Sequence, residues 1–174
     1  MTHRIDDLDR AIVRQLQEDG RLSSAEIARR IGGITERAVR YRIDRLIQEG
    51  VIRIRAIVSP RALGLPVMGD ITLEVESGHV QEVAQRVAQF DCVGYVAFSM
   101  GEKDISIQAY TRDNDELYRF ATEVLGNLSW VTKTTTLVVP QKVKDIDEWQ
   151  IPSSPCVADE RAGDLDPGIA QGPV

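Results

Sequence analysis

Apolar residues recur at helical spacing in three stretches of the first fifty positions, and each stretch has its own start and stop signals. The first helix is predicted to begin after Asp6, which can cap it. The second is predicted to begin after Ser23, with Glu26 completing a Ser-x-x-Glu capping box, and to stop at Gly32 and Gly33. Three short helices of this kind can enclose one small core.

The third helix, expected from Thr35 to Gln48, carries an apolar stripe and an arginine-rich face. Thr35 can cap it, and Gly50 closes it. Its stripe is formed by Val39, Ile43, Leu46 and Ile47. At about 100° per residue, the side chains that face away from the stripe are Arg37, Arg40, Tyr41, Asp44 and Arg45. Two helices joined by a glycine turn, the second rich in arginine, are typical of a helix-turn-helix whose polar face enters a DNA groove.

After Gly50 the pattern alternates instead, so residues 53–66 (RIRAIVSPRALGLP) are predicted to form a linking strand and hinge. Residues 67–150 then follow the order strand-helix-strand-strand-helix-strand. The connection at Gly101–Lys103 suits a hairpin, and Asp113 with Glu116 caps the second helix of this part. Right-handed crossovers put both helices on one face of an antiparallel sheet. The predicted fold class is therefore α+β, with a ferredoxin-like βαββαβ domain after the helix-turn-helix.

Charge divides the chain at the same place. The stretch from Met1 to Arg55 has twelve arginines and nine acidic residues, a net charge of +3, and the remainder has a net charge of −9. Such asymmetry favours a nucleic-acid-binding module joined to an acidic partner domain. An arginine-rich helix can also be a plain solvated face, but the concentration of positive charge argues against that reading. Arginine suits DNA because its planar fork pairs with phosphate or guanine edges.

Several other classes of function find no support in the sequence. No apolar run approaches the ~20 residues that span a bilayer, and the first ten residues have no signal-peptide core, so a cytoplasmic protein without membrane contact is expected. Cys92 and Cys156 give neither a metal-ligand spacing nor a disulfide framework. No catalytic residue, metal or cofactor is expected. Residues 151–174, rich in Pro, Gly, Ala and Asp, are predicted to be a disordered tail.

Taken in order, several segments resemble the Lrp/AsnC (feast/famine) family of transcription regulators. They are IDDLDRAIVRQLQEDGRLSSAEIARRIG, RIDRLIQEGVIR, SPRALG, MGEKD, and TKTTTLVV followed by Lys142. The resemblance covers nearly everything before the tail. It implies a winged helix-turn-helix domain over residues 1–52 and a domain over residues 67–150 that dimerises and binds small effectors, commonly amino acids. It also implies a homodimer on double-stranded DNA, and tetramers or octamers of such dimers occur in the family.

The resemblance implies two sets of site residues. The DNA-binding set is Ser24, Thr35, Glu36, Arg37, Arg40, Tyr41, Arg42, Asp44 and Arg45. The effector-binding set is Ser99, Met100, Gly101, Glu102, Lys103, Asp104, Thr134 and Thr136, the two threonines being expected to come from a neighbouring dimer. The family's hairpin commonly reads threonine-glycine-x-aromatic-aspartate, so Gly101 and Asp104 match, whereas Met100 and Lys103 depart from it. Asp104 can answer a ligand ammonium or lock the loop through its own hydrogen bonds, and the sequence leaves both readings open.

Two alternative functions remain open. Some relatives with this plan are sirohaem decarboxylases, which use histidine and arginine around a tetrapyrrole, but this chain has only His3 and His79. The other alternative is an effector-binding partner that has lost DNA binding, and the arginines of the third helix argue against it. A DNA-binding transcriptional regulator that responds to an amino acid or a related metabolite is the hypothesis that the sequence favours.

Overall fold

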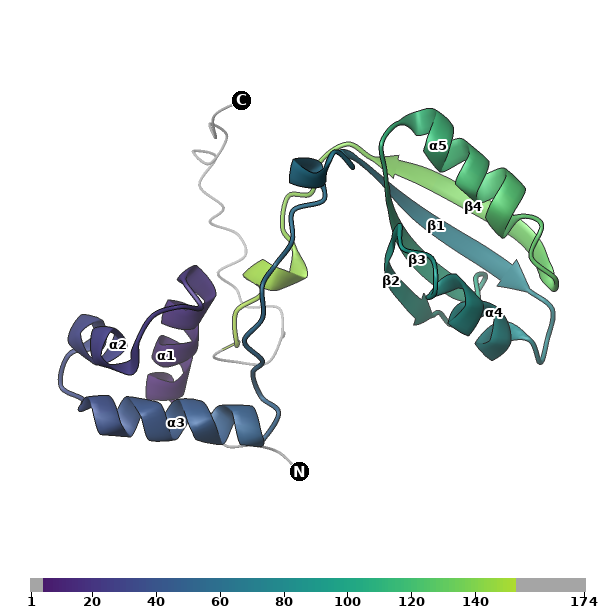
Figure 1. Cartoon of the computed structure of the whole chain (residues 1–174). Helices are drawn as coiled ribbons and strands as arrows, with labels where there is room; N and C mark the ends of the chain where they lie inside the picture. Colours follow the sequence, from purple (N-terminus) through teal and green to yellow (C-terminus); the bar gives the residue numbers. More distant parts are fainter. Residues whose placement is uncertain (1–4, 153–174) are drawn as a thin grey trace, which may run out of the picture. The chain divides into compact units, whose positions relative to one another are not determined.

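The structure, a computed structural model, describes residues 5–152 of the chain (Figure 1). It divides into two compact units. The helical unit holds the residues up to Arg55 together with those from Lys144 onward, and the sheet unit runs from Ala56 to Val143. Of the tail predicted to be disordered, only Ile151 and Pro152 fall within the described residues.

The helical unit contains the three predicted helices, α1 (Asp7–Glu18), α2 (Ser24–Ile31) and α3 (Glu36–Gln48). The predicted caps are confirmed, because Asp6, Ser23 and Thr35 each accept a backbone N–H from the first turn of their helix. The unit's core is one cluster in which Ile12, Ile27 and Val39 are fully buried. Each helix contributes one of these residues, so the core fixes the three helices to one another.

Two details of the helical unit differ from expectation. The capping box predicted at α2 is not formed, because the Glu26 carboxylate binds the guanidinium groups of Arg29 and Arg30 instead of the Ser23 backbone. Charge-assisted pairs of this kind are stronger than a neutral backbone bond. Ile47, predicted on the apolar stripe, remains exposed, whereas Ile43 one turn earlier packs on the core.

The linking strand predicted within residues 53–66 is also not formed in this chain. Residues 53–59 belong to no strand, and a short 3₁₀ turn, η1 (Arg61–Leu63), follows. A strand needs a neighbour with which to exchange backbone hydrogen bonds. The described part of the helical unit contains no strand at all, so the wing expected beside the helix-turn-helix is absent from it.

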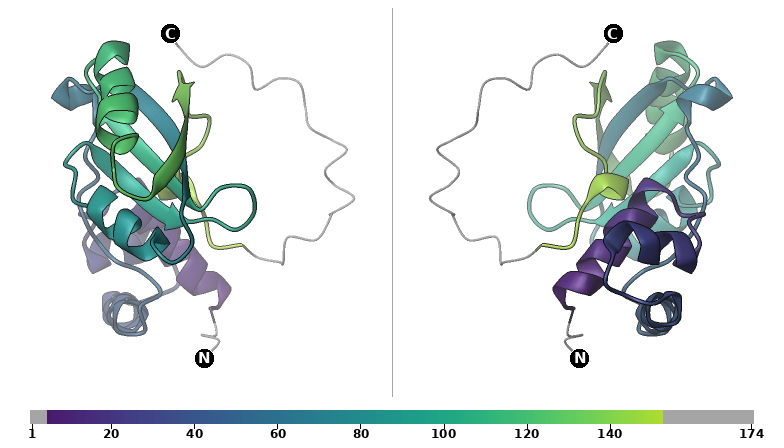
Figure 2. Two further views of the ribbon diagram at one scale, coloured as in Figure 1. Left: turned by 90° about the vertical axis from the view of Figure 1, so that its right-hand side faces the viewer. Right: turned by 90° about the vertical axis from the view of Figure 1, so that its left-hand side faces the viewer.

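The sheet unit has the predicted element order: β1 (Val67–Val75), α4 (Val80–Val87), β2 (Val93–Phe98), β3 (Ile105–Thr111), α5 (Asn114–Arg119) and β4 (Val131–Val139). The four strands pair antiparallel in the order β2-β3-β1-β4. Both helices cover the same face of the sheet, as the left view of Figure 2 shows. This arrangement confirms the ferredoxin-like expectation.

The core of the sheet unit lies between the sheet and these helices. Alternate residues of β1 and β3, such as Ile71 and Ile107, are buried against the helices. Helix α5 continues into a π-helical turn, η2 (Phe120–Leu125). The wider turn shifts the side-chain stripe, so Val124 is exposed while Leu125 is fully buried. Neither α4 nor α5 covers the other face of the sheet. Tyr95 pairs with Gln108 and Leu137 with Asp70 on that face, and both apolar side chains are exposed there.

Candidate nucleic-acid interface and small-molecule site

Helices α2 and α3 are joined by a tight turn that two glycines make possible. Gly32 and Gly33 have φ angles of 73° and 67°, a region that side chains other than glycine rarely adopt. Thr35 then caps α3 by accepting the N–H of Ala38 at 3.2 Å. The first turn of α3, with its unpaired backbone N–H groups, is therefore presented at the surface rather than in the core.

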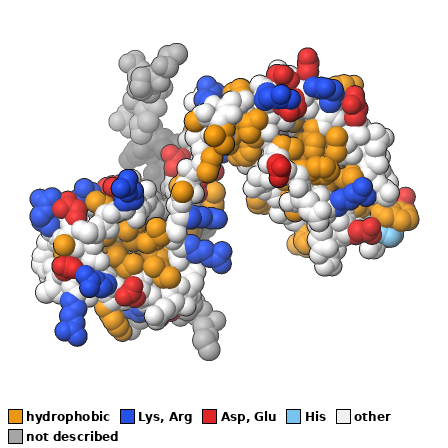
Figure 3. All heavy atoms as spheres, in the orientation of Figure 1, with side chains coloured by type: hydrophobic (Ala, Val, Ile, Leu, Met, Phe, Trp, Pro, Cys, Tyr) orange, Lys and Arg blue, Asp and Glu red, His pale blue; other side chains and the backbone are white. Residues whose placement is uncertain are grey.

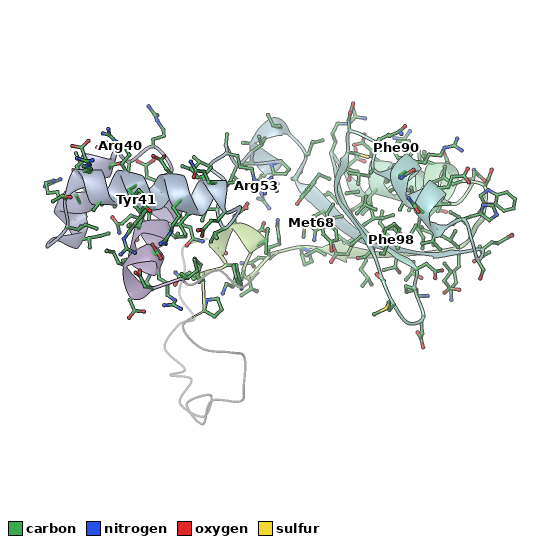
Figure 4. All side chains as sticks on the ribbon, turned by 90° about the horizontal axis from the view of Figure 1, so that it is seen from below. Arg40, Tyr41, Arg53, Met68, Phe90 and Phe98 are labelled. Carbon is green, nitrogen blue, oxygen red and sulfur yellow. The ribbon has the colours of Figure 1, made fainter. Side chains whose placement is uncertain are left out.

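The outward face of α3 is polar and accessible. Four of its predicted residues, Arg37, Arg40, Tyr41 and Asp44, are exposed, and with Thr35 and Glu36 they line a shallow hollow along the helix. Figure 4 shows Arg40 and Tyr41 on this helix, and Figure 3 shows basic side chains projecting from the helical unit. The Tyr41 side chain is 68% exposed, so its ring is accessible to a partner. Arg40 forms a surface ion pair with Glu36, and such pairs are weak enough to be exchanged for a phosphate.

Arg42 and Arg45, which were also predicted to contact DNA, are held inside the helical unit. Arg42 Nη1 lies 2.7 Å from Asp6 Oδ2 and 2.8 Å from Asp9 Oδ1. Arg45 Nη2 lies 2.6 Å from Asp9 Oδ2. Arg45, predicted on the outward face, is 30% exposed, and its guanidinium turns toward a buried carboxylate on α1. Its contact with DNA stays a prediction.

Asp9 is the residue that sequence reasoning missed. Its side chain is 0% exposed, and its two oxygens bind guanidinium groups from two turns of α3. A buried carboxylate is tolerated only when it is paired in this way. The signal in the sequence is a pair of acidic residues three apart on the first helix and a pair of arginines three apart on the third. Asp9 therefore sets the position of α3 on α1.

The charges of this cluster shift one another's protonation. The guanidinium of Arg42 lowers the pKa of Asp6 to about 2, and Asp6 in turn raises the pKa of Arg42. Arg45 Nε is buried and makes no hydrogen bond within residues 5–152. Arg42 and Arg45 are therefore committed to α1, while Arg37 and Arg40 remain at the surface.

The hairpin half of the predicted effector site is a loop locked by its own aspartate. Asp104 Oδ2 accepts the Val75 N–H at 2.8 Å, and the Asp104 N–H donates to Leu73 O at 2.9 Å. The sequence left open whether Asp104 binds a ligand ammonium or holds the loop. For Oδ2 the geometry favours the second role. At the tip of the loop Gly101 has a φ of 126°, and the Met100 side chain is fully exposed.

The loop also carries an ion-pair cluster. Lys103 pairs with Glu74 on β1, and Lys133 on β4 lies 3.4 Å from the same carboxylate. Hydrogen bonding to Lys103 lowers the pKa of Glu74 and raises that of Lys103. Lys103, where the family pattern has an aromatic residue, is thus tied to the sheet.

The other half of the predicted effector site lies elsewhere in the chain. Thr134 and Thr136 line a hollow of about 280 Å³ between η2 and β4, with Ala121, Thr122, Gly126, Val131, Thr132 and Lys133. The hydroxyl of Thr134 is buried and makes no hydrogen bond within the described residues. The loop residues do not line this hollow, so one chain does not bring the two predicted sets together.

Three further observations bear on the alternatives. His79 stacks on Trp130 with ring centroids 3.8 Å apart, which occupies one face of the imidazole. Within residues 5–152, no three His, Cys, Asp or Glu side chains are grouped so that they could hold a metal ion. No helix in that range has the length and apolar content to cross a membrane.

Comparison with known families matches both units. Residues 5–53 match the family described as "Winged helix-turn-helix DNA-binding", and residues 70–149 match the "Lrp/AsnC ligand binding domain". The two matches together leave out little more than the hinge and the tail. The helix-turn-helix assignment and the ligand-binding character of the sheet unit are both supported.

Individual relatives point the same way. The chain is 38% identical over 136 residues to an HTH-type transcriptional regulator of Pyrococcus horikoshii, covering 78% of this chain and 85% of that one. It is 33% identical over 148 residues to the HTH-type transcriptional regulator FL11 of Pyrococcus abyssi, and the match covers 84% of this chain and 97% of FL11. Among solved structures, E. coli AsnC superposes with a TM-score of 0.75 at 26% identity, covering 83% and 99%. A Neisseria meningitidis regulator solved as an L-Met complex shares the fold, with a TM-score of 0.74 at 23% identity, covering 82% and 94%.

Proposed function

We propose, from the premise that this chain belongs to the Lrp/AsnC family of DNA-binding transcriptional regulators, that α3 reads the major groove of a degenerate palindrome while the sheet unit binds an amino acid. The observation that carries the proposal is the division of arginines on α3. Arg37 and Arg40 are exposed beside Tyr41, whereas Arg42 and Arg45 anchor the helix from behind. A reading helix needs both a free face and a fixed position.

On this proposal the exposed arginines have two kinds of target. A planar guanidinium pairs with guanine O6 and N7 or with phosphate oxygens, and the first kind of contact carries sequence information. The Tyr41 ring offers an apolar surface for a thymine methyl group. Thr35 and the exposed first turn of α3 suit the phosphate backbone at the groove edge.

A homodimer supplies the second reading helix. The face of the sheet opposite the helices exposes Tyr95 and Leu137, and a second copy stacked on it would cover both. Two-fold symmetry then places the two α3 helices on half-sites separated by about 34 Å, one helical turn of DNA, or by a multiple of it. Higher assemblies of such dimers are compatible with the same contacts.

For the ligand, the hollow beside β4 is the better supported half of the site. Its buried Thr134 hydroxyl has no hydrogen-bond partner among residues 5–152, and an unsatisfied buried polar group gains most from a ligand that hydrogen-bonds to it. Thr136, which lines the hollow beside Thr134, adds a second hydroxyl that can donate to a carboxylate or accept from an ammonium group. An amino acid has both kinds of group, and L-Met in the Neisseria relative makes methionine a sensible first candidate.

The non-enzymatic reading follows from the relatives, which are named transcriptional regulators, and from the stacked position of His79. A regulator of this kind acts where the chromosome is, so we place it in the cytoplasm. The sirohaem decarboxylase alternative would require histidines grouped around a tetrapyrrole pocket. His79 is the one histidine among residues 5–152, and Trp130 stacks on one face of its ring.

The proposal is tested by fluorescence anisotropy with the DNA upstream of the protein's own gene and a scrambled fragment of equal length. Salt is varied, and a panel of amino acids that includes L-methionine is added. We expect tighter binding to the upstream fragment, a steep loss of affinity with salt, and modulation by one amino acid with a coupling of about 1–3 kcal/mol. Equal affinity for both fragments would refute sequence-specific reading, and indifference to the whole panel would refute the amino-acid ligand.

A further inference from the structure

Two segments of the chain connect the helical unit and the sheet unit. The second of them follows β4 and leads back to α1. After β4 the chain rejoins the helical unit at Lys144, and the short 3₁₀ turn η3 (Ile146–Glu148) follows. A reciprocal capping box orders this turn: the Asp145 side chain accepts the Glu148 N–H, and Glu148 Oε2 accepts the Asp145 N–H at 2.9 Å. Asp145 Oδ1 also accepts the Ile146 N–H at 2.7 Å. The segment Asp145–Pro152, called the strap below, therefore begins with a defined local structure.

Two side chains of α1 bind the backbone of the strap. Gln17 Nε2 donates to Trp149 O at 2.7 Å, and Arg10 Nε donates to Pro152 O at 3.4 Å. Residues seven apart lie on one face of a helix, about 10 Å from each other along its axis. Three extended residues of the strap also span about 10 Å. The two spacings match, so the strap can run along α1 and meet a donor at each end.

Burial on the same side of α1 supports a covering element. Val13 lies between Arg10 and Gln17 on the helix, and it is buried although it is not part of the three-helix core cluster. Leu46 of α3 is likewise fully buried outside that cluster. In the strap, Ile151 is half-buried, although it is one of the last described residues. The burial of Val13 and Ile151 is what a strap lying along this face of α1 would produce.

We propose that the outer face of α1, formed by Arg10, Val13 and Gln17, is a docking surface for the chain's own strap. The docked strap is a fourth element of the helical unit and a second covalent connection from the sheet to it. The strap follows directly on β4, the strand that carries Thr134 and Thr136, and it docks on the helix whose Asp9 holds α3. A role in relaying ligand binding to α3 rests on the proposed function, whereas the docking itself does not. The match to the Lrp/AsnC ligand-binding family also extends to residue 149, past the end of the sheet.

The test is ¹⁵N relaxation of the full-length protein without DNA or ligand, so its result is independent of whether the proposed function holds. We expect order parameters of about 0.8 for residues 146–151, close to those of α1, and below about 0.6 in Gln17→Ala and in Glu148→Ala. Asp147→Ala is the matched control, because it removes the same charge from the same turn but leaves the capping box intact. Order parameters below about 0.6 for residues 146–151 of the unaltered protein would overturn the docking. Order parameters that stay unchanged in both Gln17→Ala and Glu148→Ala would overturn it too.

A second measurement identifies the source of the strap. Isotope-filtered NOEs are recorded on a mixture of labelled and unlabelled chains, between the Trp149 and Ile151 side chains and Val13. The proposal predicts that these NOEs arise within one chain. NOEs between chains would overturn it in favour of a strap exchanged between two copies.

Discussion

At the scale of single residues, the buried carboxylate of Asp9 decides which arginines of α3 face outward. We expect Asp9→Ala to lower the free energy of unfolding by about 2–4 kcal/mol, because two guanidinium groups lose their buried counter-charge. Urea unfolding of the full-length protein measures this. Asp7→Ala is the control, since that side chain is 99% exposed on the same helix and should change stability by no more than about 1 kcal/mol. Equal effects of the two substitutions would show that Asp9 does not hold α3.

Asp6 adds a pH dependence to the same cluster. Its pKa falls from the ordinary 3.8 to about 2 beside Arg42, so the folded state favours the charged carboxylate. The resulting stability is fully present above about pH 4 and is lost as the pH falls toward 2. Because Asp6 is half exposed, we expect this ion pair to contribute no more than about 1 kcal/mol to the free energy of unfolding. Urea unfolding between pH 5 and pH 2 should show a smaller loss of stability in Asp6→Asn than in the unaltered protein, and parallel curves would contradict this.

These residue-scale features differ in how far the sequence predicts them. The caps at Asp6, Ser23 and Thr35 were predictable because an N-cap depends on a few neighbouring positions. The fate of Arg45 was not, because it depends on a carboxylate 36 residues away. A wheel projection orients side chains relative to one helix only. It does not include a buried charge on another helix.

At the scale of elements, Gly69 sets how closely α5 approaches the sheet. A Cβ atom there would lie 2.6 Å from Leu117 Cδ1, which is closer than side chains pack. We expect Gly69→Val to lower the free energy of unfolding by about 1–3 kcal/mol, because the buried Leu117 side chain must leave its packed position between α5 and β1. Thr72→Val, a substitution on the opposite face of the same strand, is the control. If both variants unfold at the same urea concentration, the close approach of α5 carries no stability.

Element order and type followed largely from hydrophobic period, which alternates along β1 and β3, and from the β-branched composition of β4. The π-helical turn η2 did not, because an extra residue in one turn leaves the composition of the segment unchanged. The linking strand is not formed within residues 5–152 for a different reason. Alternation in VIRIRAIVS shows that the segment can pair, but pairing also needs a second strand, and the described chain offers none there.

At the scale of the whole molecule, the open face of the sheet is the surface on which dimerisation is proposed. Leu137 is 65% exposed there and lies opposite Asp70, so Leu137→Lys places a favourable charge pair within one chain while charging the interface. We expect the dimer dissociation constant to rise at least about tenfold, because a buried lysine must be desolvated. Sedimentation equilibrium measures this, with Tyr118→Lys on α5 as the control. A dimer that tolerates Leu137→Lys would move the interface elsewhere.

The division into two units followed from the change of hydrophobic period and the charge asymmetry, although residues 144–152 join the helical unit rather than the sheet unit. No pattern in the sequence signals that return, because it rests on two backbone carbonyls that bind α1 side chains more than 130 residues away. The effector site was predicted to join the hairpin of one copy to Thr134 and Thr136 of a neighbouring dimer. One chain does not bring the two sets together, and their meeting in an assembly stays a prediction.

The central claim is that α3 reads DNA with Arg37 and Arg40 and is held in place by Arg45. The most direct test measures operator affinity and urea unfolding together for Arg37→Ala/Arg40→Ala, for Arg45→Ala, and for Arg86→Ala, which removes an exposed arginine from α4 of the sheet unit, as a control. We predict that the double variant loses about 10- to 100-fold in operator affinity while its unfolding free energy stays within about 0.5 kcal/mol. Arg45→Ala should instead lose about 1–3 kcal/mol of stability. A double variant that binds the operator as tightly as Arg86→Ala does would contradict the account.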